Sequence, residues 1–284
     1  MYYGRSGAGA ALRPKAMPVR ALQHFARMRG GAQAQLLLGQ DLRYYIVKFQ
    51  NNPQHRRVLA NELVAAALLD YLELPAPRWD IVKVDAELIA GSPGLYVETA
   101  GRREPCAAGL QFGSQYPGDP ALNPVYDYVP DSLLRQVKNA DSFIGMVAFD
   151  QWVSNADGRQ AIFFRDPKTP PHSGFVAKMI DHGFAFTAQK WEFRDLPQAG
   201  IYPRTWLYER VSGYDSFHPY LDRIVRLPEE VLDAAEKRVP GEWLNGDREA
   251  LGGLLERLWE RRKRLPDLLR AVKNGPRDPF PNWR

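Results

Sequence analysis

The chain has 284 residues, of which 45% are hydrophobic and 25% are charged, a composition typical of a globular protein and not of a disordered or collagen-like chain. No apolar run approaches the roughly 20 residues of a membrane-spanning helix, and Met1 to Ala10 lack the apolar core of a signal peptide, so we expect a cytoplasmic protein with no membrane partner. The single cysteine, Cys106, excludes an internal disulfide, and the five histidines show no metal-ligand spacing.

Positive charge is concentrated near the start of the chain. The whole sequence carries 38 Lys and Arg against 33 Asp and Glu, a net charge of +5, whereas residues 1–60 contain ten basic residues and one acidic residue, Asp41. Such a block is typical either of a solvated basic tail or of a surface that meets an anion, a phosphate or a nucleic acid. Because residues 1–20 show no hydrophobic periodicity, we expect an N-terminal arm over residues 1–27.

A β-hairpin and a helix are the first predicted elements. The runs 35–39 and 44–49 are rich in apolar, aromatic and β-branched residues and flank a turn at 39–41, which predicts the hairpin. Asn52-Pro53 then predicts the start of a helix, and apolar residues at helical spacing continue it to Leu72.

Short strands, a linker and further helices are predicted next. Frequent glycine and proline indicate a linker at 101–130, and the 3.6-residue period of the apolar side chains predicts a long helix from Asp131 or Ser132 to Trp152. The predicted strands are 81–84, 87–90, 95–99, 161–164 and 175–180, and the region 204–273 is mostly helical, with a basic amphipathic helix at 254–272. We therefore expect an α+β protein with a small β-rich lobe containing one helix at 28–110 and a mainly helical lobe at 111–284.

Two aspartates and a glutamine are predicted to meet at one end of the second hairpin. If Ala161 pairs with Ile180, Gln160 lies opposite Asp181, and the preceding helix brings Asp157 to the same end. Two carboxylates and an amide oxygen suit Mg²⁺, which prefers hard oxygen ligands. The alternative is that both aspartates only cap turns.

A lysine and a glutamate are predicted to form a buried ion pair. Strand alternation places Lys48 on the same face as Ile46, and Glu62 lies beside the apolar stripe of the next helix. Protein kinases use such a pair to hold a strand lysine against the phosphates of ATP. The alternatives are a structural salt bridge or a Lys48 that extends to water. Upstream, Gly30-Gly31 lies where a phosphate-covering loop would be, although glycine pairs also mark ordinary turns.

Six short motifs occur in order along the chain: Gly30-Gly31-Ala32-Gln33, Ile46-Val47-Lys48-Phe49, Asn61-Glu62-Leu63, Leu74-Pro75-Ala76-Pro77, Asn155-Ala156-Asp157-Gly158-Arg159 and Ile180-Asp181-His182-Gly183. Their order and spacing resemble those of HipA-like kinases, which are atypical relatives of the phosphoinositide and protein kinases. The resemblance covers roughly residues 28–185 and implies a bilobal protein-kinase-like fold.

The resemblance also implies a role for each motif. Asp157 would be the catalytic aspartate that orients the acceptor hydroxyl and takes its proton, and Asp181 would hold Mg²⁺. Arg159 would either offset charge on the transferred group or pair with Asp150 or Asp181. The implied nucleotide contacts are Gly30, Gly31 and Gln33 in the phosphate loop, Lys48 with Glu62 behind it, and Gln111 and Phe112 in a hinge at 109–114.

The catalytic motif departs from the family pattern. The family has Asp-Gly-His or Asp-Arg-His, then two residues, then an asparagine that binds the second metal. Here the fifth residue after Asp157 is Ile162, and the simplest alignment gives the asparagine's role to Gln160, whose amide oxygen sits on a side chain longer by one methylene. In addition, no Ser or Thr occurs between residues 7 and 91, so inhibition by phosphorylation of a serine in the phosphate loop is excluded.

The function that the resemblance implies is an ATP- and Mg²⁺-dependent kinase that transfers the γ-phosphate to a hydroxyl of a protein or a small molecule, and a cognate regulatory protein would be a further partner. An alternative, motivated by the replaced asparagine, is a nucleotide-binding pseudokinase that serves as a scaffold. A third is nucleic-acid binding through the basic block and the cluster at Arg261 to Arg264, but no base-reading motif supports it. Nucleic acid is therefore not an expected partner.

Overall fold

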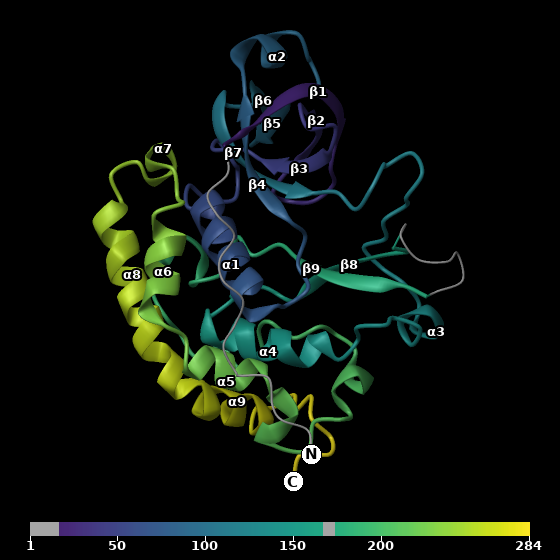
Figure 1. Cartoon of the computed structure of the whole chain (residues 1–284), viewed down its shortest axis with the longest axis vertical. Coiled ribbons are helices and arrows are strands. Elements are labelled where there is room, and N and C mark those ends of the chain that lie inside the picture. Colours follow the sequence, from purple (N-terminus) through teal and green to yellow (C-terminus); the bar gives the residue numbers. More distant parts are fainter. Residues whose placement is uncertain (1–16, 167–173) are drawn as a thin grey trace.

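A β-barrel and a mainly helical part make up the molecule in the computed structural model, which describes residues 17–166 and 174–284 (Figure 1). Each part has its own hydrophobic core: one lies inside the barrel, and the other runs through the helical part and includes helix α1 (Val58–Leu72), which lies beneath the barrel. Residues 1–16 of the predicted arm, which covered 1–27, lie outside the described residues. No helix within the described ranges has the length and the apolar character that crossing a membrane requires.

Five strands close the barrel. Their order around it is β1 (Val19–Arg27), β2 (Gln35–Gly39), β3 (Tyr44–Lys48), β7 (Gly109–Gln115) and β4 (Trp79–Val84), which returns to β1. The predicted hairpin is confirmed as β2 and β3, with Gln35 opposite Val47. Tyr45 and Val47 point into the barrel core, so alternation turns Lys48 to the opposite side of the sheet.

Several elements of the barrel region differ from the prediction. Residues 19–27 of the expected arm form β1, whose two register irregularities interrupt the alternation of inward side chains and conceal the strand in the sequence. The predicted strand at 87–90 is helix α2 (Ala86–Ala90). The predicted linker contains β6 (Arg102–Pro105), which pairs with β5 (Tyr96–Thr99), and β7, so the predicted lobe boundary after residue 110 falls inside a barrel strand.

Helix α1 connects the two parts and is buried on nearly every side. All of its residues except Asp70 are buried, which is why its apolar positions show no single face. The helix begins at Val58, six positions after the predicted start, because the Asn52 side chain forms a separate turn: it accepts a hydrogen bond from Gln54 N at 2.9 Å and donates to Ala32 O at 3.0 Å.

The helical part contains a second hairpin and, within the described residues, seven α-helices. Its elements are α3 (Asp131–Leu134), α4 (Ser142–Trp152), β8 (Gln160–Phe164), β9 (Val176–Ile180), α5 (Tyr220–Val225), α6 (Glu229–Glu236), α7 (Gly241–Leu244), α8 (Arg248–Arg261) and α9 (Leu265–Lys273), with short 3-10 turns η1 (Ala188–Lys190), η2 (Thr205–Tyr208), η3 (Tyr214–Phe217) and η4 (Arg262–Arg264). The predicted helix 131–152 is divided into α3 and α4 because Asn139 leaves the helical path and forms two hydrogen bonds with the backbone of Ala177, at 2.8 and 2.9 Å. The predicted helix 254–272 is likewise divided at η4.

The second hairpin is antiparallel, as predicted, but its register differs by one residue. Gln160 pairs with Ile180 and Ala161 with Met179, whereas the prediction paired Ala161 with Ile180. The observed register places the buried side chains of Ala161 and Met179 on one face. The predicted register would have placed Lys178 on that buried face, and a one-residue shift reverses the face of every side chain.

Candidate active site

Lys48 is the centre of a buried group of charges. It is only 9% exposed, and its ammonium contacts two carboxylates: Glu62 Oε1, from the middle of α1, and Asp181 Oδ1, at 2.8 Å, from the loop that follows β9. The predicted ion pair between Lys48 and Glu62 is therefore confirmed. The contact with Asp181 joins the barrel to the second hairpin, which the sequence did not reveal directly.

The three groups determine each other's ionisation. Burial alone would lower the pKa of Lys48, but the charges of Glu62 and Asp181 outweigh it and raise that pKa above its ordinary value. Burial raises the pKa of Glu62 despite the attraction of Lys48. Burial would also raise the pKa of Asp181, but Lys48 outweighs it and holds the pKa below its ordinary value. An ammonium and an ionised carboxylate thus lie side by side.

The loop that carries Asp181 is packed against α1. Asp181 has a φ of +61°, a left-handed conformation that a non-glycine residue keeps only when its surroundings hold it. The next residue donates its backbone N–H to Glu62 at 3.0 Å. Gly183 accepts hydrogen bonds from His55 at 2.9 Å and Asn61 at 2.8 Å, and a Cβ at Gly183 would lie 2.6 Å from Val58. The close approach therefore requires glycine at this position.

Asp157 lies at the same end of the second hairpin as Asp181, because β8 begins at Gln160, β9 ends at Ile180, and these two residues are paired. The Asp157 carboxylate is partly exposed and accepts two hydrogen bonds, from Gly158 N at 2.7 Å and from Gln160 Nε2 at 3.2 Å. These bonds fix the direction of the carboxylate while leaving it accessible.

Gln160 does not lie opposite Asp181, as predicted, but pairs with Ile180 and turns its side chain toward Asp157. Only the amide nitrogen can donate to a carboxylate, so the amide oxygen of Gln160 points elsewhere and is available to a cation. Within the ranges that the structure describes, no three His, Cys, Asp or Glu side chains gather as a metal-binding group. Any divalent ion here would therefore depend on few protein ligands.

Arg159 is buried, and its guanidinium is fully enclosed. Its Nε lies 3.0 Å from Asp150 Oδ2, and Nη1 donates to Ile180 O at 3.0 Å. Of the two predicted roles, the structure shows the pairing with Asp150. The other role, offsetting charge on the transferred group, stays a prediction.

The glycine-containing segment 28–34 is the turn between β1 and β2. Gly30 has a φ of +108°, which glycine adopts without strain. The Gln33 side chain, predicted to contact phosphate, instead accepts hydrogen bonds from Arg27 at 2.6 Å and from Glu98 N at 2.7 Å, and it donates to Glu98 O at 2.7 Å. The backbone of the turn, and not the Gln33 side chain, is left to bind a ligand.

The predicted hinge at 109–114 is the barrel strand β7. Gln111 is fully buried; it accepts a hydrogen bond from Gln50 N and donates to Ala107 O, each at 2.8 Å. Phe112 is buried and stacks on Trp79. Both side chains are thus occupied inside the fold, and neither side chain is free to contact a base. The chain leaves the barrel only after Gln115.

Four buried polar residues support the site: His55, Asn61, Asp150 and Asn155. From the sequence, only one of them, Asp150, was expected to have a role, as a possible partner of Arg159. Asn61 donates to three carbonyls of the segment after Asp181, and Asp150 and Asn155 support the loop of Asp157. For Asn61 and Asp150, the sequence did contain a signal: each is a polar residue inside an otherwise apolar helical run. Because a buried polar group needs a hydrogen-bond partner, such a position indicates a specific polar contact inside the fold.

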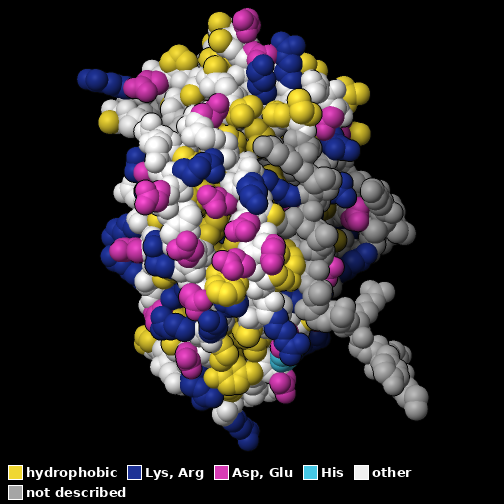
Figure 2. Space-filling view, turned by 60° about the vertical axis from the view of Figure 1, so that its left-hand side comes forward, with side chains coloured by type: hydrophobic (Ala, Val, Ile, Leu, Met, Phe, Trp, Pro, Cys, Tyr) yellow, Lys and Arg dark blue, Asp and Glu magenta, His cyan; other side chains and the backbone are white. Residues whose placement is uncertain are grey.

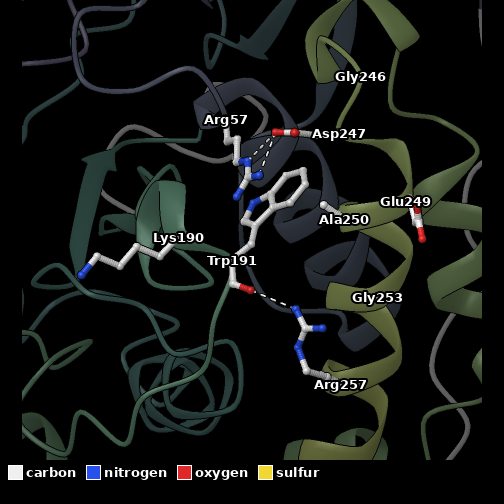
Figure 3. A pocket seen from close by; sticks show the side chains of 9 residues that line it. All are labelled: Arg57, Lys190, Trp191, Gly246, Asp247, Glu249, Ala250, Gly253 and Arg257. Carbon is white, nitrogen blue, oxygen red and sulfur yellow. Dashed lines mark hydrogen bonds and ion pairs between the residues drawn. The ribbon is translucent and has the colours of Figure 1, made fainter.

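A pocket of about 520 Å³ lies beside the start of α1 and the first turns of α8 (Figure 3). Trp191 lies at its centre, with the Arg57 guanidinium 4.0 Å above the indole ring and Arg257 bonded to its carbonyl at 3.0 Å. Arg57 also donates to Asp247 at 2.8 Å. The indole N–H donates to Asn61 at 2.7 Å, so this pocket connects to the helix that carries Glu62.

Comparisons with known proteins agree on one fold. No curated protein matches the chain. Two solved structures resemble it: the Golgi casein kinase, with a TM-score of 0.51 and 13% identity over 92% of this chain and 75% of that one, and the Helicobacter pylori proinflammatory kinase CtkA, with a TM-score of 0.50 and 12% identity over 89% of this chain and 95% of that one. At these identities they show a kinase-like fold. The model of the HipA-like kinase family matches residues 25–265, most of the chain, and the protein therefore belongs to the HipA-like kinase family.

Proposed function

We propose that the protein is an ATP- and Mg²⁺-dependent kinase that transfers the γ-phosphate to a hydroxyl of a protein or a small molecule. Family membership supports phosphotransfer in general. The observation that carries the proposal is the buried contact of Lys48 with both Glu62 and Asp181, since it places an ammonium that would bind phosphate next to a carboxylate that would bind the metal ion. A cytoplasmic location and a cognate regulatory protein stay predictions.

The residues of the site fit a nucleotide and a divalent ion. Lys48 and the backbone N–H groups of turn 28–34 would offset the charge of the phosphates, with Glu62 holding Lys48 in place. Asp181 and the amide oxygen of Gln160 are hard oxygen donors, and Mg²⁺ commonly takes one or two such protein ligands and completes its shell with phosphate and water. The bound ion would neutralise charge that develops on the phosphates.

Asp157 would act on the acceptor. In the transfer, the acceptor oxygen forms a bond to the γ-phosphorus, the bond between that phosphorus and the β,γ-bridging oxygen breaks, and the hydroxyl proton passes to Asp157. The bonds from Gly158 and Gln160 to the Asp157 carboxylate would keep it directed at the acceptor. The chain between Gln115 and Gly118, which follows β7, is proposed as the contact for the base in place of Gln111 and Phe112.

Three isosteric variants test this proposal: Lys48→Met, Asp157→Asn and Asp181→Asn. Each is expected to reduce transfer from γ-labelled ATP by at least about 100-fold, because each removes a charged group that acts in the transition state. Thermal unfolding would establish that each variant is folded. A folded variant with wild-type transfer would remove that residue from the proposed mechanism.

A second candidate function is a nucleotide-binding scaffold without turnover, motivated by the alignment that would give Gln160 the role of the second metal-binding asparagine. It requires Mg²⁺-dependent binding of ATP with no transfer above background. Calorimetric titration of ATP with and without Mg²⁺, followed by an assay for ADP formation, separates the two candidates. Sustained ADP formation that is lost in Asp157→Asn would exclude the scaffold.

Nucleic-acid binding receives no support from the helical basic cluster. Arg261 and Arg264 both pair with Asp195, at 2.9 and 2.8 Å, and Lys263 pairs with Glu260 at 2.7 Å. Figure 2 shows acidic and basic side chains interspersed over the visible face. Paired charges of both signs do not form the continuous basic surface that a phosphate backbone requires.

A further inference from the structure

A single buried carboxylate lies between the two loops that carry Asp157 and Asp181. Asp150, near the end of α4, is 1% exposed, and its two oxygens have different partners. Oδ1 accepts a hydrogen bond from Asn155 Nδ2 at 3.0 Å, and Oδ2 forms an ion pair with Arg159 Nε at 3.0 Å that lacks the geometry of a hydrogen bond. Asn155 belongs to the loop that carries Asp157, and the Arg159 side chain extends to the loop that carries Asp181.

The first branch runs through Asn155 to Asp157. The backbone N–H of Asn155 donates to Asp150 O at 2.9 Å, which closes the turn after α4. The Asn155 side chain then accepts a hydrogen bond from Asp157 N at 3.2 Å. Gly200 adds a further constraint: its N–H donates to Asp157 O at 2.9 Å, and a Cβ there would lie 2.3 Å from Asp150 Cβ. The backbone position of Asp157 is therefore set against Asp150.

The second branch runs through Arg159 to the loop after β9. The guanidinium donates to Ile180 O at 3.0 Å and to Asp181 O at 3.4 Å, and it contacts His182 Nδ1 at 3.3 Å. These bonds surround the residue with the left-handed backbone conformation, Asp181. An arginine can span these acceptors because its planar guanidinium presents five N–H groups in fixed directions.

Stability does not account for this arrangement. Burying two charges costs desolvation that their attraction repays only in part, and apolar replacements of buried ion pairs are often neutral or stabilising. What the ion pair provides that an apolar pair would not is a set of directed bonds to both loops.

We propose that Asp150 is a positioning residue that, through Asn155 and Arg159, sets the placement of Asp157 relative to Asp181. The inference rests on the proposed kinase function, in which these two aspartates act together on the acceptor and the metal ion. Lys48 contacts this network only at its end, through the Asp181 carboxylate at 2.8 Å, and it keeps Glu62 as a second partner that lies outside the network. Loss of the network therefore lowers kcat much more than it changes the KM for ATP.

The test removes both charges together, since a single substitution would leave an unpaired buried charge. The double variant Asp150→Asn/Arg159→Gln is expected to lose about 100-fold in kcat, the scale of a misplacement of about 1 Å, with the KM for ATP within about threefold of wild type. The matched control is Arg223→Gln, which removes an arginine bonded to Leu72 O and Glu73 at the far end of α1. The control keeps the wild-type kcat.

A second variant keeps the test valid if the double variant does not fold. Asn155→Ala cuts only the first branch and leaves the ion pair, and it is expected to lose about tenfold in kcat. Wild-type kcat in a folded double variant, or in Asn155→Ala, overturns the inference while leaving the kinase function standing. A wild-type chain that neither binds ATP nor turns it over overturns the proposed function, and the inference falls with it.

Discussion

The substitution Glu62→Gln tests whether the buried glutamate holds Lys48 for catalysis. Glutamine keeps the size of the side chain and an oxygen that can accept from His182 N, but it removes the charge that faces Lys48. A hydrogen bond between charged groups contributes about 1.5–3 kcal/mol, and about 1.4 kcal/mol corresponds to a tenfold change in rate. We therefore expect kcat/KM for ATP to fall about 10- to 150-fold.

The stability of this variant should change only moderately. Lys48 keeps Asp181 at 2.8 Å and so is not left as an unpaired buried charge. Burial raises the pKa of Glu62, which means that its ionised form is itself costly in the folded state. The free energy of unfolding in urea is expected to change by less than about 2 kcal/mol.

Glu73→Gln is the matched control, because Glu73 also pairs with a basic residue, Arg223, but at the exposed end of α1. It should leave kcat/KM unchanged, since exposed ion pairs contribute about 1 kcal/mol or less. Steady-state ADP formation at varied ATP concentration measures both variants. Wild-type kcat/KM in folded Glu62→Gln would refute the idea that the pair orients Lys48.

Three further variants test the supports of the site. Burial lowers the pKa of His55, so below about pH 6.5 the unfolded chain gains a proton that the folded chain does not. The free energy of unfolding therefore decreases as the pH is lowered, by up to about 1.4 kcal/mol per pH unit. His55→Gln should remove this part of the pH dependence, measured by urea unfolding between about pH 5 and 6.5. Trp191→Phe loses the bond to Asn61 and should cost about 1–3 kcal/mol of unfolding free energy; an unchanged midpoint and slope would contradict this. Gly183→Ala should cost about 1–3 kcal/mol and lower ATP turnover, whereas Gly252→Ala, where a Cβ meets nothing within 4 Å, should be tolerated; equal effects would contradict the tight packing.

Local patterns were enough to locate the pieces of the site. The alternation in Tyr44–Lys48 and the apolar run of α1 predicted a buried lysine on one element and a buried glutamate on the next, and the ion pair is present. The two hairpins were also predictable, because strand periodicity and turn residues act over a few neighbouring positions.

Long-range contacts account for the predictions that failed. β1 lacks a regular alternation of inward side chains and depends on its partner strands on both sides. β7 contains glycines, which made its sequence resemble a linker, but in the fold they let it pack closely between β3 and β4. Gln33 and Gln111 have amide groups suited to a ligand, but neighbours distant in sequence occupy them. No local pattern encodes which partner a polar side chain will meet.

The order of residues was enough to identify the groups that form the candidate site: the Lys48 ammonium, the carboxylates of Asp157 and Asp181, and a glycine-containing turn. Each of these could be predicted because it depends on the residues next to it in the chain. How these groups come together depends on the tertiary structure. Lys48 ends β3 and Asp181 follows β9, so they are far apart in the sequence, and the packing of the barrel on α1 brings them into contact. The same holds for Arg159, whose enclosure by Asp150 and the carbonyl of Ile180 depends on the register of one short hairpin. Packing of the whole chain, through burial and the need to satisfy buried polar groups, determines those contacts.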